Sequence, residues 1–163
     1  MGSAALDAHF NFKLSSTLDE FSGRGKLGST NLENFNLILR PLANVNTSGQ
    51  LNNLEFNIHG NKNKATGELK MDYEKLQVEV LSKEKQKKNL LLSSMAGIVV
   101  NNNNLAGDNS FKIGTISAQK VRYKSFMNYL WISLRSGIID IVAPTLDKKN
   151  KKNIYKYAYL YYI

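Results

Sequence analysis

Side chains that could do acid–base or metal chemistry are few and scattered along this sequence. His9 and His59 are the only histidines, and each falls in or beside a segment with the alternation of a β-strand. Neither has a carboxylate at metal-ligand spacing, and no His-Glu-x-x-His or related motif is present. The sequence therefore predicts no metal site and no catalytic histidine.

The nucleophiles and carboxylates also lack the context of a catalytic site. No serine stands in a Gly-x-Ser-x-Gly elbow, and the absence of cysteine excludes disulfides, thiolate metal sites and cysteine nucleophiles. Two pairs of carboxylates, at positions 19–20 and 72–74, read as turn and polar-face residues, and their spacing does not support a glycosidase pair. We therefore expect a protein that is not an enzyme and has no cofactor.

The segment 23–28 contains the letters Gly-x-Gly-x-x-Gly of a dinucleotide-binding loop. Such a loop must join a buried parallel strand to the N-terminus of a helix. Here the preceding stretch is polar, and the segment that should supply the ribose-binding acid reads as a helix. We interpret the match as chance and the glycines as marks of curvature in a strand.

The formal net charge is +9, from 22 Lys and Arg against 13 Asp and Glu. Only 4 of the cations are Arg, and 20 residues are Asn, a bias typical of AT-rich coding. The densest cationic runs, 83–88 and 148–152, fall in linkers, whereas a nucleic-acid-binding protein would gather Arg on one face. We expect solvated loops first, an anionic membrane surface second, and no nucleic-acid partner.

Much of the chain alternates with the period of a β-strand. The predicted strands cover 10–14, 45–58, 65–73, 76–80 and 111–122. Asn52-Asn53 shifts the alternation by one residue and predicts a bulge, and 60–63 predicts a turn. The three runs between 45 and 80 predict an antiparallel meander with one apolar and one polar face. Alternating tyrosines at 153–163 suggest a terminal edge strand or a tail.

Three segments have helical spacing, namely 32–42, 89–100 and 126–142. The first is expected to be capped by Ser29 or Thr30 together with Glu33, and to end near Pro41. The third is strongly apolar, but its 17 residues include Arg135 and Asp140, so it is a poor transmembrane span. A helix buried on the sheet is favoured over an interfacial membrane helix.

Together these segments predict an α+β fold, a curved antiparallel meander whose apolar face is covered by three helices. A single domain is expected over residues 1–145, followed by a Lys- and Tyr-rich tail at 146–163. The start, Met1-Gly2-Ser3, resembles an expression scar joined to a fragment of a longer protein, and no secretory signal is evident.

The order of these segments resembles a known family. The pattern that carries the resemblance is Asn31-x4-Asn36-x2-Leu39-x-Pro41, Val45-x2-Ser48-Gly49-x-Leu51-x2-Leu54-x-Phe56-x-Ile58-x-Gly60, Ala65-x-Gly67-x-Leu69-x-Met71-x-Tyr73-x2-Leu76-x-Val78-x-Val80 and, later, Phe126-x-Asn128-x-Leu130-Trp131-x-Ser133-Leu134-x-Ser136-Gly137. Over about residues 20–142 it is similar to the C-terminal region of AsmA-like proteins of Bacteroidetes, which are related to DUF748 proteins.

The resemblance implies a periplasmic part of an envelope protein that is anchored in the inner membrane and takes part in outer-membrane biogenesis. In such proteins a curved sheet is thought to form a groove that carries phospholipid acyl chains between membranes. No catalytic residues transfer from the family. The partners implied are phospholipid acyl chains, together with the membrane surface or other envelope proteins.

Two sets of residues are candidates for this role. The candidate lipid-facing residues of the sheet are Phe56, Ile58, Leu69, Met71, Leu76 and Val78. The candidate helical cover consists of Leu130, Trp131, Leu134 and Ile138. The alternative is a structural or protein-interaction domain in which the same residues form a closed core and no lipid binds.

Overall fold

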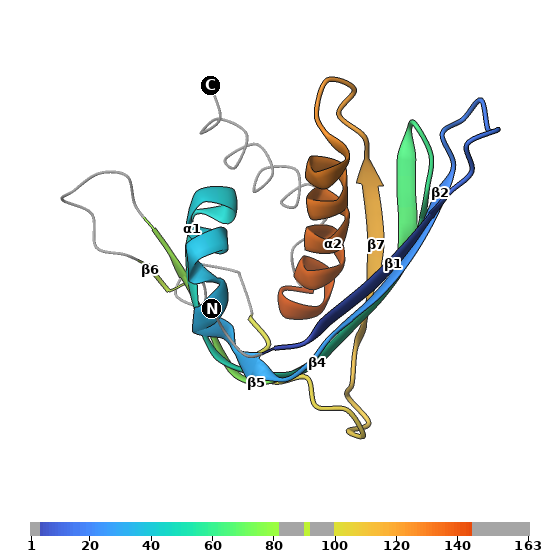
Figure 1. The fold of residues 1–163 in the computed structure, drawn as a ribbon. Helices are drawn as coiled ribbons and strands as arrows, with labels where there is room; N and C mark the ends of the chain where they lie inside the picture. Colours follow the sequence, from blue (N-terminus) through green and yellow to red (C-terminus); the bar gives the residue numbers. More distant parts are fainter. Residues whose placement is uncertain (1–3, 82–89, 92–99, 145–163) are drawn as a thin grey trace.

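The computed structural model describes residues 4–81, 90–91 and 100–144, and these form a curved sheet with two helices on its concave side (Figure 1). The strands are β1 (Leu6–Phe12), β2 (Phe21–Leu27), β3 (Thr30–Asn31), β4 (Val45–Gly60), β5 (Lys64–Val80), β6 (Leu90–Leu91) and β7 (Ile113–Gln119). The helical segments are the 3-10 turn η1 (Leu32–Phe35), α1 (Asn36–Ala43) and α2 (Phe126–Val142). The predicted α+β class is confirmed.

Every strand pairing in the described sheet is antiparallel, and the sheet does not close on itself. The main path runs β1-β2-β4-β5-β6. Both β2 and β3 pair with β4 on the side away from β5, while β7 pairs with the first half of β5 and β6 with its end. The long pair β4–β5 is therefore the centre of the sheet, and the other strands lie beside it.

Two irregularities in the β4–β5 pair accompany the curvature of the sheet. The register shifts between Leu51 and Asn53, which confirms the predicted bulge. A second shift lies at Gly49, where φ is +118° and a Cβ would meet the Lys75 carbonyl oxygen at 2.6 Å. Bulges bend and twist the strand that carries them, so these two positions favour the bend seen in Figure 1.

The prediction of separate strands at 65–73 and 76–80 is wrong, because β5 runs unbroken from Lys64 to Val80. Lys75 has a φ of +54° and produces a bulge rather than a reversal of the chain. The extra residue shifts the alternation by one position, and so Tyr73 and Leu76 are both buried. The predicted turn at 60–63 is confirmed.

The prediction of three helices is also wrong in the described part of the chain, which contains two. Segment 32–42 starts as a 3-10 turn after Asn31 and not from a capping box, because Thr30 is held in strand β3. Within 89–100, Leu90 and Leu91 form strand β6 beside the end of β5, and residues 89 and 92–99 lie outside the described residues. The tail at 146–163 lies outside them as well.

Helix α2 follows its prediction residue for residue. Its N-cap is Ser125, whose hydroxyl oxygen accepts a hydrogen bond from the Asn128 amide at 3.3 Å. It lies over β5 and β7 and covers the apolar side chains of the sheet (Figure 1). Among the described residues, no helix has the length and apolar character needed to span a membrane.

Candidate functional site

The six candidate lipid-facing residues all point to the concave side, and five of them are buried. Ile58 and Leu69 are 0% exposed, and Phe56, Met71 and Leu76 are also buried. Val78 is half-buried and packs against the same core. Because protein atoms already cover these side chains, they form the floor of the concave side and not its open surface.

Helix α2 approaches the sheet through small residues. Its buried stripe consists of Tyr129, Ser133, Gly137 and Ile141. At the closest point, a Cβ on Gly114 of β7 would lie 2.2 Å from the Gly137 carbonyl oxygen. The absence of side chains at both positions therefore sets how closely the helix and strand approach each other.

Because the stripe of Tyr129, Ser133, Gly137 and Ile141 faces the sheet, the four residues predicted as the helical cover lie on the flank of α2. Leu130, Leu134 and Ile138 are partly buried and pack against the core, and Trp131 is half-buried farther round the helix. Sequence reasoning missed the true contact stripe, because hydrophobicity favours Leu and Trp over Ser and Gly. The pairing of Gly114 with Gly137 is the only signal that could have found it.

The opposite flank of α2 caps the outer edge of β7. The Thr115 amide donates a hydrogen bond to Asp140 Oδ2 at 3.0 Å, and the Ser117 amide donates one to Ser136 Oγ at 2.9 Å. Residues four apart on a helix and two apart on a strand are both about 6–7 Å apart along their axes. This match allows one helix face to satisfy alternate amides of the strand.

Helix α1 lies on the sheet with Asn36, Leu39, Leu42 and Ala43 half-buried, and hydrogen bonds tie it to β4. Asn36 exchanges hydrogen bonds with the backbone of Thr47 at 2.9 and 2.7 Å, and Arg40 Nε donates to Asn46 Oδ1 at 2.7 Å. The helix buries no residue fully. Its aliphatic side chains at Leu37 (78% exposed) and Ile38 (54% exposed) are consequently left in solvent.

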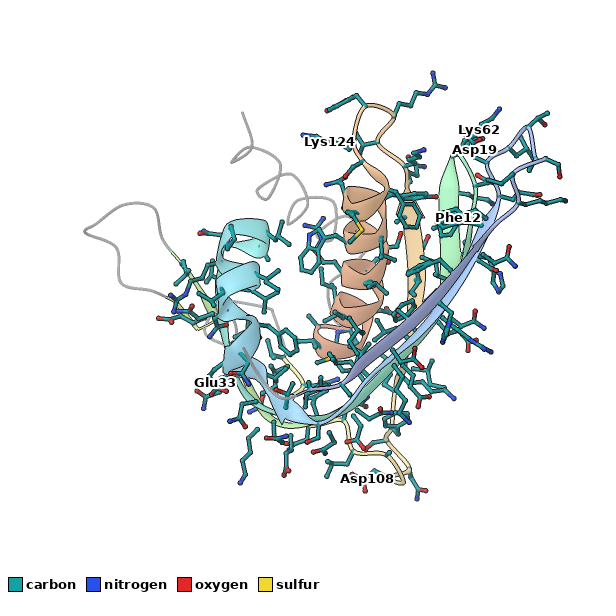
Figure 2. All side chains as sticks on the ribbon, viewed as in Figure 1. Phe12, Asp19, Glu33, Lys62, Asp108 and Lys124 are labelled. Carbon is teal, nitrogen blue, oxygen red and sulfur yellow. The ribbon has the colours of Figure 1, made fainter. Side chains whose placement is uncertain are left out.

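The two helices together present what we call the apolar helix surface. It comprises Leu37 and Ile38 of α1 and Met127, Leu130, Trp131, Leu134 and Ile138 of α2. Met127 is 67% exposed, and the α2 residues other than Met127 are half-buried. Both helices stand on the concave side, and side chains extend from each toward the other (Figures 1 and 2).

The asparagine run at 101–104 is a hydrogen-bonding strip between β5, the start of β7 and the end of α2. Asn104 is 5% exposed, and its amide group donates to the carbonyls of Met71 and Lys112 and accepts from the Lys112 amide. Asn101 reaches the end of α2, where its side chain donates to the Ile141 carbonyl at 3.0 Å. In the sequence, four asparagines in a row give no indication of these different roles.

The two histidines lie on the convex face and do not converge. His9 Nε2 lies 3.0 Å from Asp7 Oδ1 on β1, and both side chains are exposed. His59 is on β4, two strands away, and lines a hollow of about 560 Å³ together with Glu20 and Lys13. No group of three or more metal-ligating side chains occurs among the residues that the structure describes.

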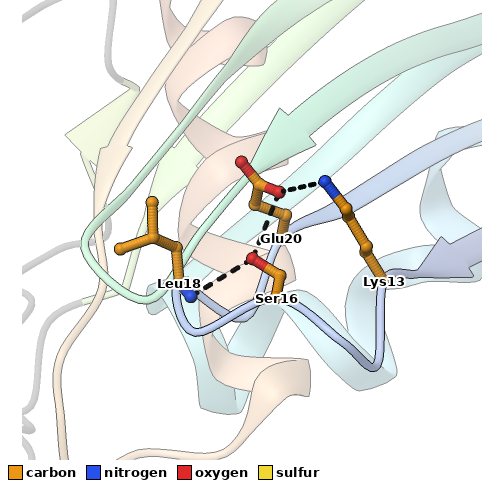
Figure 3. A network of polar contacts seen from close by, with 4 residues as sticks. All are labelled: Lys13, Ser16, Leu18 and Glu20. Carbon is orange, nitrogen blue, oxygen red and sulfur yellow. Dashed lines mark hydrogen bonds and ion pairs between the residues drawn. The ribbon is translucent and has the colours of Figure 1, made fainter.

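Glu20 is the one carboxylate in that hollow, and it is already engaged (Figure 3). Lys13 Nζ donates to Glu20 Oε2 at 3.3 Å, and the Ser16 hydroxyl donates to the same oxygen at 3.1 Å. These hydrogen bonds from Lys13 and Ser16 hold the pKa of Glu20 below its ordinary value. A general acid needs a raised pKa. The lowered pKa of Glu20 therefore indicates a structural role and not proton transfer.

The fold and its surfaces define an open antiparallel α+β sheet whose concave side carries a covered core and exposed apolar helix residues. Comparisons of the chain with protein-family models, with curated proteins and with solved structures find no match. The similarity to AsmA-like proteins therefore depends on the sequence pattern alone.

Proposed function

We propose that this protein is a non-catalytic lipid-handling module that holds phospholipid acyl chains on the concave side of its sheet. The observation that carries the proposal is the apolar helix surface. Leu37 and Met127 stand largely in solvent on the same side of the molecule as the core. Large apolar side chains that stay exposed on one side of a protein are candidates for a binding surface.

Burial of an acyl chain there would supply enough free energy without polar chemistry. Each buried methylene contributes about 0.8 kcal/mol, so sixteen of them contribute on the order of 10 kcal/mol when fully covered. The ligand contacts in this proposal lie on α1 and α2. The sheet residues beneath them, such as Ile58 and Leu69, act as the floor that holds α2 in place.

The sequence resemblance supplies the cellular setting of the proposal. It assigns the chain to the periplasmic part of an AsmA-like protein that is anchored in the inner membrane and acts in outer-membrane biogenesis. The module would then take part in phospholipid transport between the two membranes. A curved, open sheet with an apolar concave side is consistent with the end of such a groove.

One observation favours the alternative of a structural or protein-interaction domain. The centre of the sheet is a closed core, with Ile58, Leu69 and Ile116 fully buried beneath α2. In that case the apolar helix surface would bind a protein partner instead of a lipid. The two functions make different predictions for what copurifies with the chain.

Native mass spectrometry of gently purified protein tests the proposal. The wild-type chain is expected to carry phospholipid, and the double variant Leu37→Asp/Ile38→Asp is expected to lose most of it while keeping its thermal unfolding temperature. The control is Ile113→Asp, which introduces one aspartate, half the charge change of the double variant, at a 44% exposed isoleucine of β7. Ile113 precedes Gly114, whose missing side chain faces α2, so it lies on the convex face.

Lipid-free wild-type protein would overturn the proposal and favour the protein-interaction alternative. Equal lipid loss in the Ile113→Asp control would show that the effect is one of charge alone and would also count against it. Loss of lipid in the α1 variant, with the control unchanged, would locate the acyl site on the apolar helix surface.

A further inference from the structure

A second surface lies at the end of the sheet where the loops β1–β2 and β7–α2 and the turn β4–β5 meet. We infer that this surface, here called the basic rim, docks on an anionic lipid membrane. It comprises residues 13–20, 61–64 and 119–124. Figure 2 shows Asp19 and Lys62 close together at this end, with Lys124 on the loop before α2. The inference extends the proposed function, because it names the surface on which the lipid module would work.

The three segments of the rim are tied to one another by hydrogen bonds. The Lys62 amide donates to the Leu18 carbonyl at 2.8 Å, and its ammonium group donates to the Thr17 carbonyl at 3.0 Å. The Lys120 amide donates to the Asn63 carbonyl at 2.8 Å. The loops therefore form one connected surface and not three independent tips.

The rim is strongly cationic. It contains six cations and two carboxylates, a net charge of +4. The cations are Lys13, Lys62, Lys64, Lys120, Arg122 and Lys124. One of the two carboxylates, Glu20, is already paired with Lys13 at 3.3 Å. Part of the rim forms a hollow of about 390 Å³ lined only by cationic and amide side chains, with no carboxylate.

Apolar side chains stand among these cations at the loop tips. Leu14 is 96% exposed and Tyr123 is 79% exposed, and Leu18 is also exposed. The Lys124 ammonium lies 5.5 Å from the centre of the Tyr123 ring. Aromatic and aliphatic side chains enter the headgroup layer while lysines bind anionic lipids, so this combination suits a membrane surface.

The same features disfavour a nucleic acid as the partner. Five of the six cations are Lys, and Arg122 alone offers the bidentate geometry that nucleic-acid sites prefer. Leu14 and Leu18 have no base-stacking face, whereas both can insert between acyl chains. The convex face of the sheet, by contrast, has mixed charges, such as Lys26 paired with Glu55 at 3.2 Å.

Vesicle sedimentation of the full chain tests the inference. Wild-type protein is expected to bind vesicles of equal parts phosphatidylglycerol and phosphatidylcholine, and to dissociate from them as the salt concentration rises. It is expected not to bind vesicles of pure phosphatidylcholine. The double variant Lys64→Glu/Lys120→Glu should bind anionic vesicles roughly tenfold or more weakly. The control Lys26→Glu/Lys70→Glu makes the same change in net charge on the sheet strands and should bind nearly as wild type.

Leu14→Ser provides a second variant that leaves the charge intact, and it is expected to weaken binding several-fold. Equal loss in the rim and control variants would overturn the inference, because net charge alone would then explain binding. Binding to single-stranded RNA but not to vesicles would overturn it in favour of a nucleic acid.

These outcomes are separable from those of the proposed function. Rim variants should keep the copurified phospholipid that Leu37→Asp/Ile38→Asp loses. A chain that binds anionic vesicles but carries no phospholipid would refute the acyl-chain proposal and leave the basic rim standing.

Discussion

At the residue scale, the buried side chain of Asn104 joins β5 to the start of β7. Its amide group makes hydrogen bonds of 2.8, 3.0 and 2.7 Å to the backbones of Met71 and Lys112, and its own backbone pairs with Tyr73. A buried carbonyl or amide that loses its partner is costly, because neither water nor protein then satisfies it.

Asn104→Ala is therefore expected to lower the free energy of unfolding by roughly 2 to 4 kcal/mol. Asn102→Ala is the matched control, because that side chain is exposed and only its backbone carbonyl accepts a bond, from the Leu76 amide at 2.8 Å. Urea unfolding of both variants measures the difference. Equal losses would contradict a specific role for Asn104.

At the element scale, the strands and α2 were predictable because their apolar residues follow the periods of two and 3.6 that these structures impose. The orientations of the helices were not. The sequence predicted that α1 lies on the sheet, but not that Asn36 and Arg40 would hydrogen-bond to β4 and leave Leu37 and Ile38 in solvent. No local signal marks such tertiary hydrogen bonds.

The union of two predicted strands into β5 was hidden for a different reason. The left-handed backbone conformation is usually adopted by glycine or asparagine. Here Lys75 adopts it, opposite Gly49. The bulge at Asn52-Asn53 could be predicted because it disrupts the alternation within an otherwise regular run. For the candidate site, the sequence predicted which sheet side chains share a face and that α2 lies over them, but not which residues of α2 make the closest contact.

The docking of α2 gives a testable consequence at this scale. Gly114→Ala adds a methyl group that would lie 2.2 Å from the Gly137 carbonyl oxygen, so the helix must shift away from β7. We expect a loss of about 1 to 3 kcal/mol in the free energy of unfolding. Gly28→Ala serves as the control, since its nearest atom would be at 3.7 Å. Thermal and urea unfolding measure both, and a neutral Gly114→Ala would refute the close crossing.

At the scale of the whole molecule, two buried tyrosines link distant parts of the fold. The Tyr73 hydroxyl donates to the Asn101 carbonyl at 2.9 Å, and the Tyr129 hydroxyl donates to the Asn61 carbonyl at 3.2 Å. Removal from water raises the pKa of both phenols to about 12. In the unfolded chain a tyrosine ionises near pH 10.

Stability is therefore expected to fall between about pH 10 and pH 12. In this window the unfolded chain has released protons that the folded chain still holds, so raising the pH favours unfolding. The contribution of each phenol is fully present below pH 10 and decreases by on the order of 2 kcal/mol by pH 12.

Urea unfolding at about pH 9 and about pH 11 measures this slope. Tyr73→Phe should reduce the slope, because it removes one of the two phenols whose pKa is raised. An identical slope in wild type and Tyr73→Phe would contradict the proposed linkage.

The hydrogen bonds that the Thr115 and Ser117 amides of β7 make to α2 determine where a further strand could pair with the sheet. A strand from a neighbouring repeat or another chain cannot pair there without displacing Ser136 and Asp140 from Ser117 and Thr115. Along the described main path, β1 is the strand at the opposite border, with β2 as its one neighbour. Where the strand order is β1-β2-β4-β5-β7, a further strand would therefore add at β1 and not at β7.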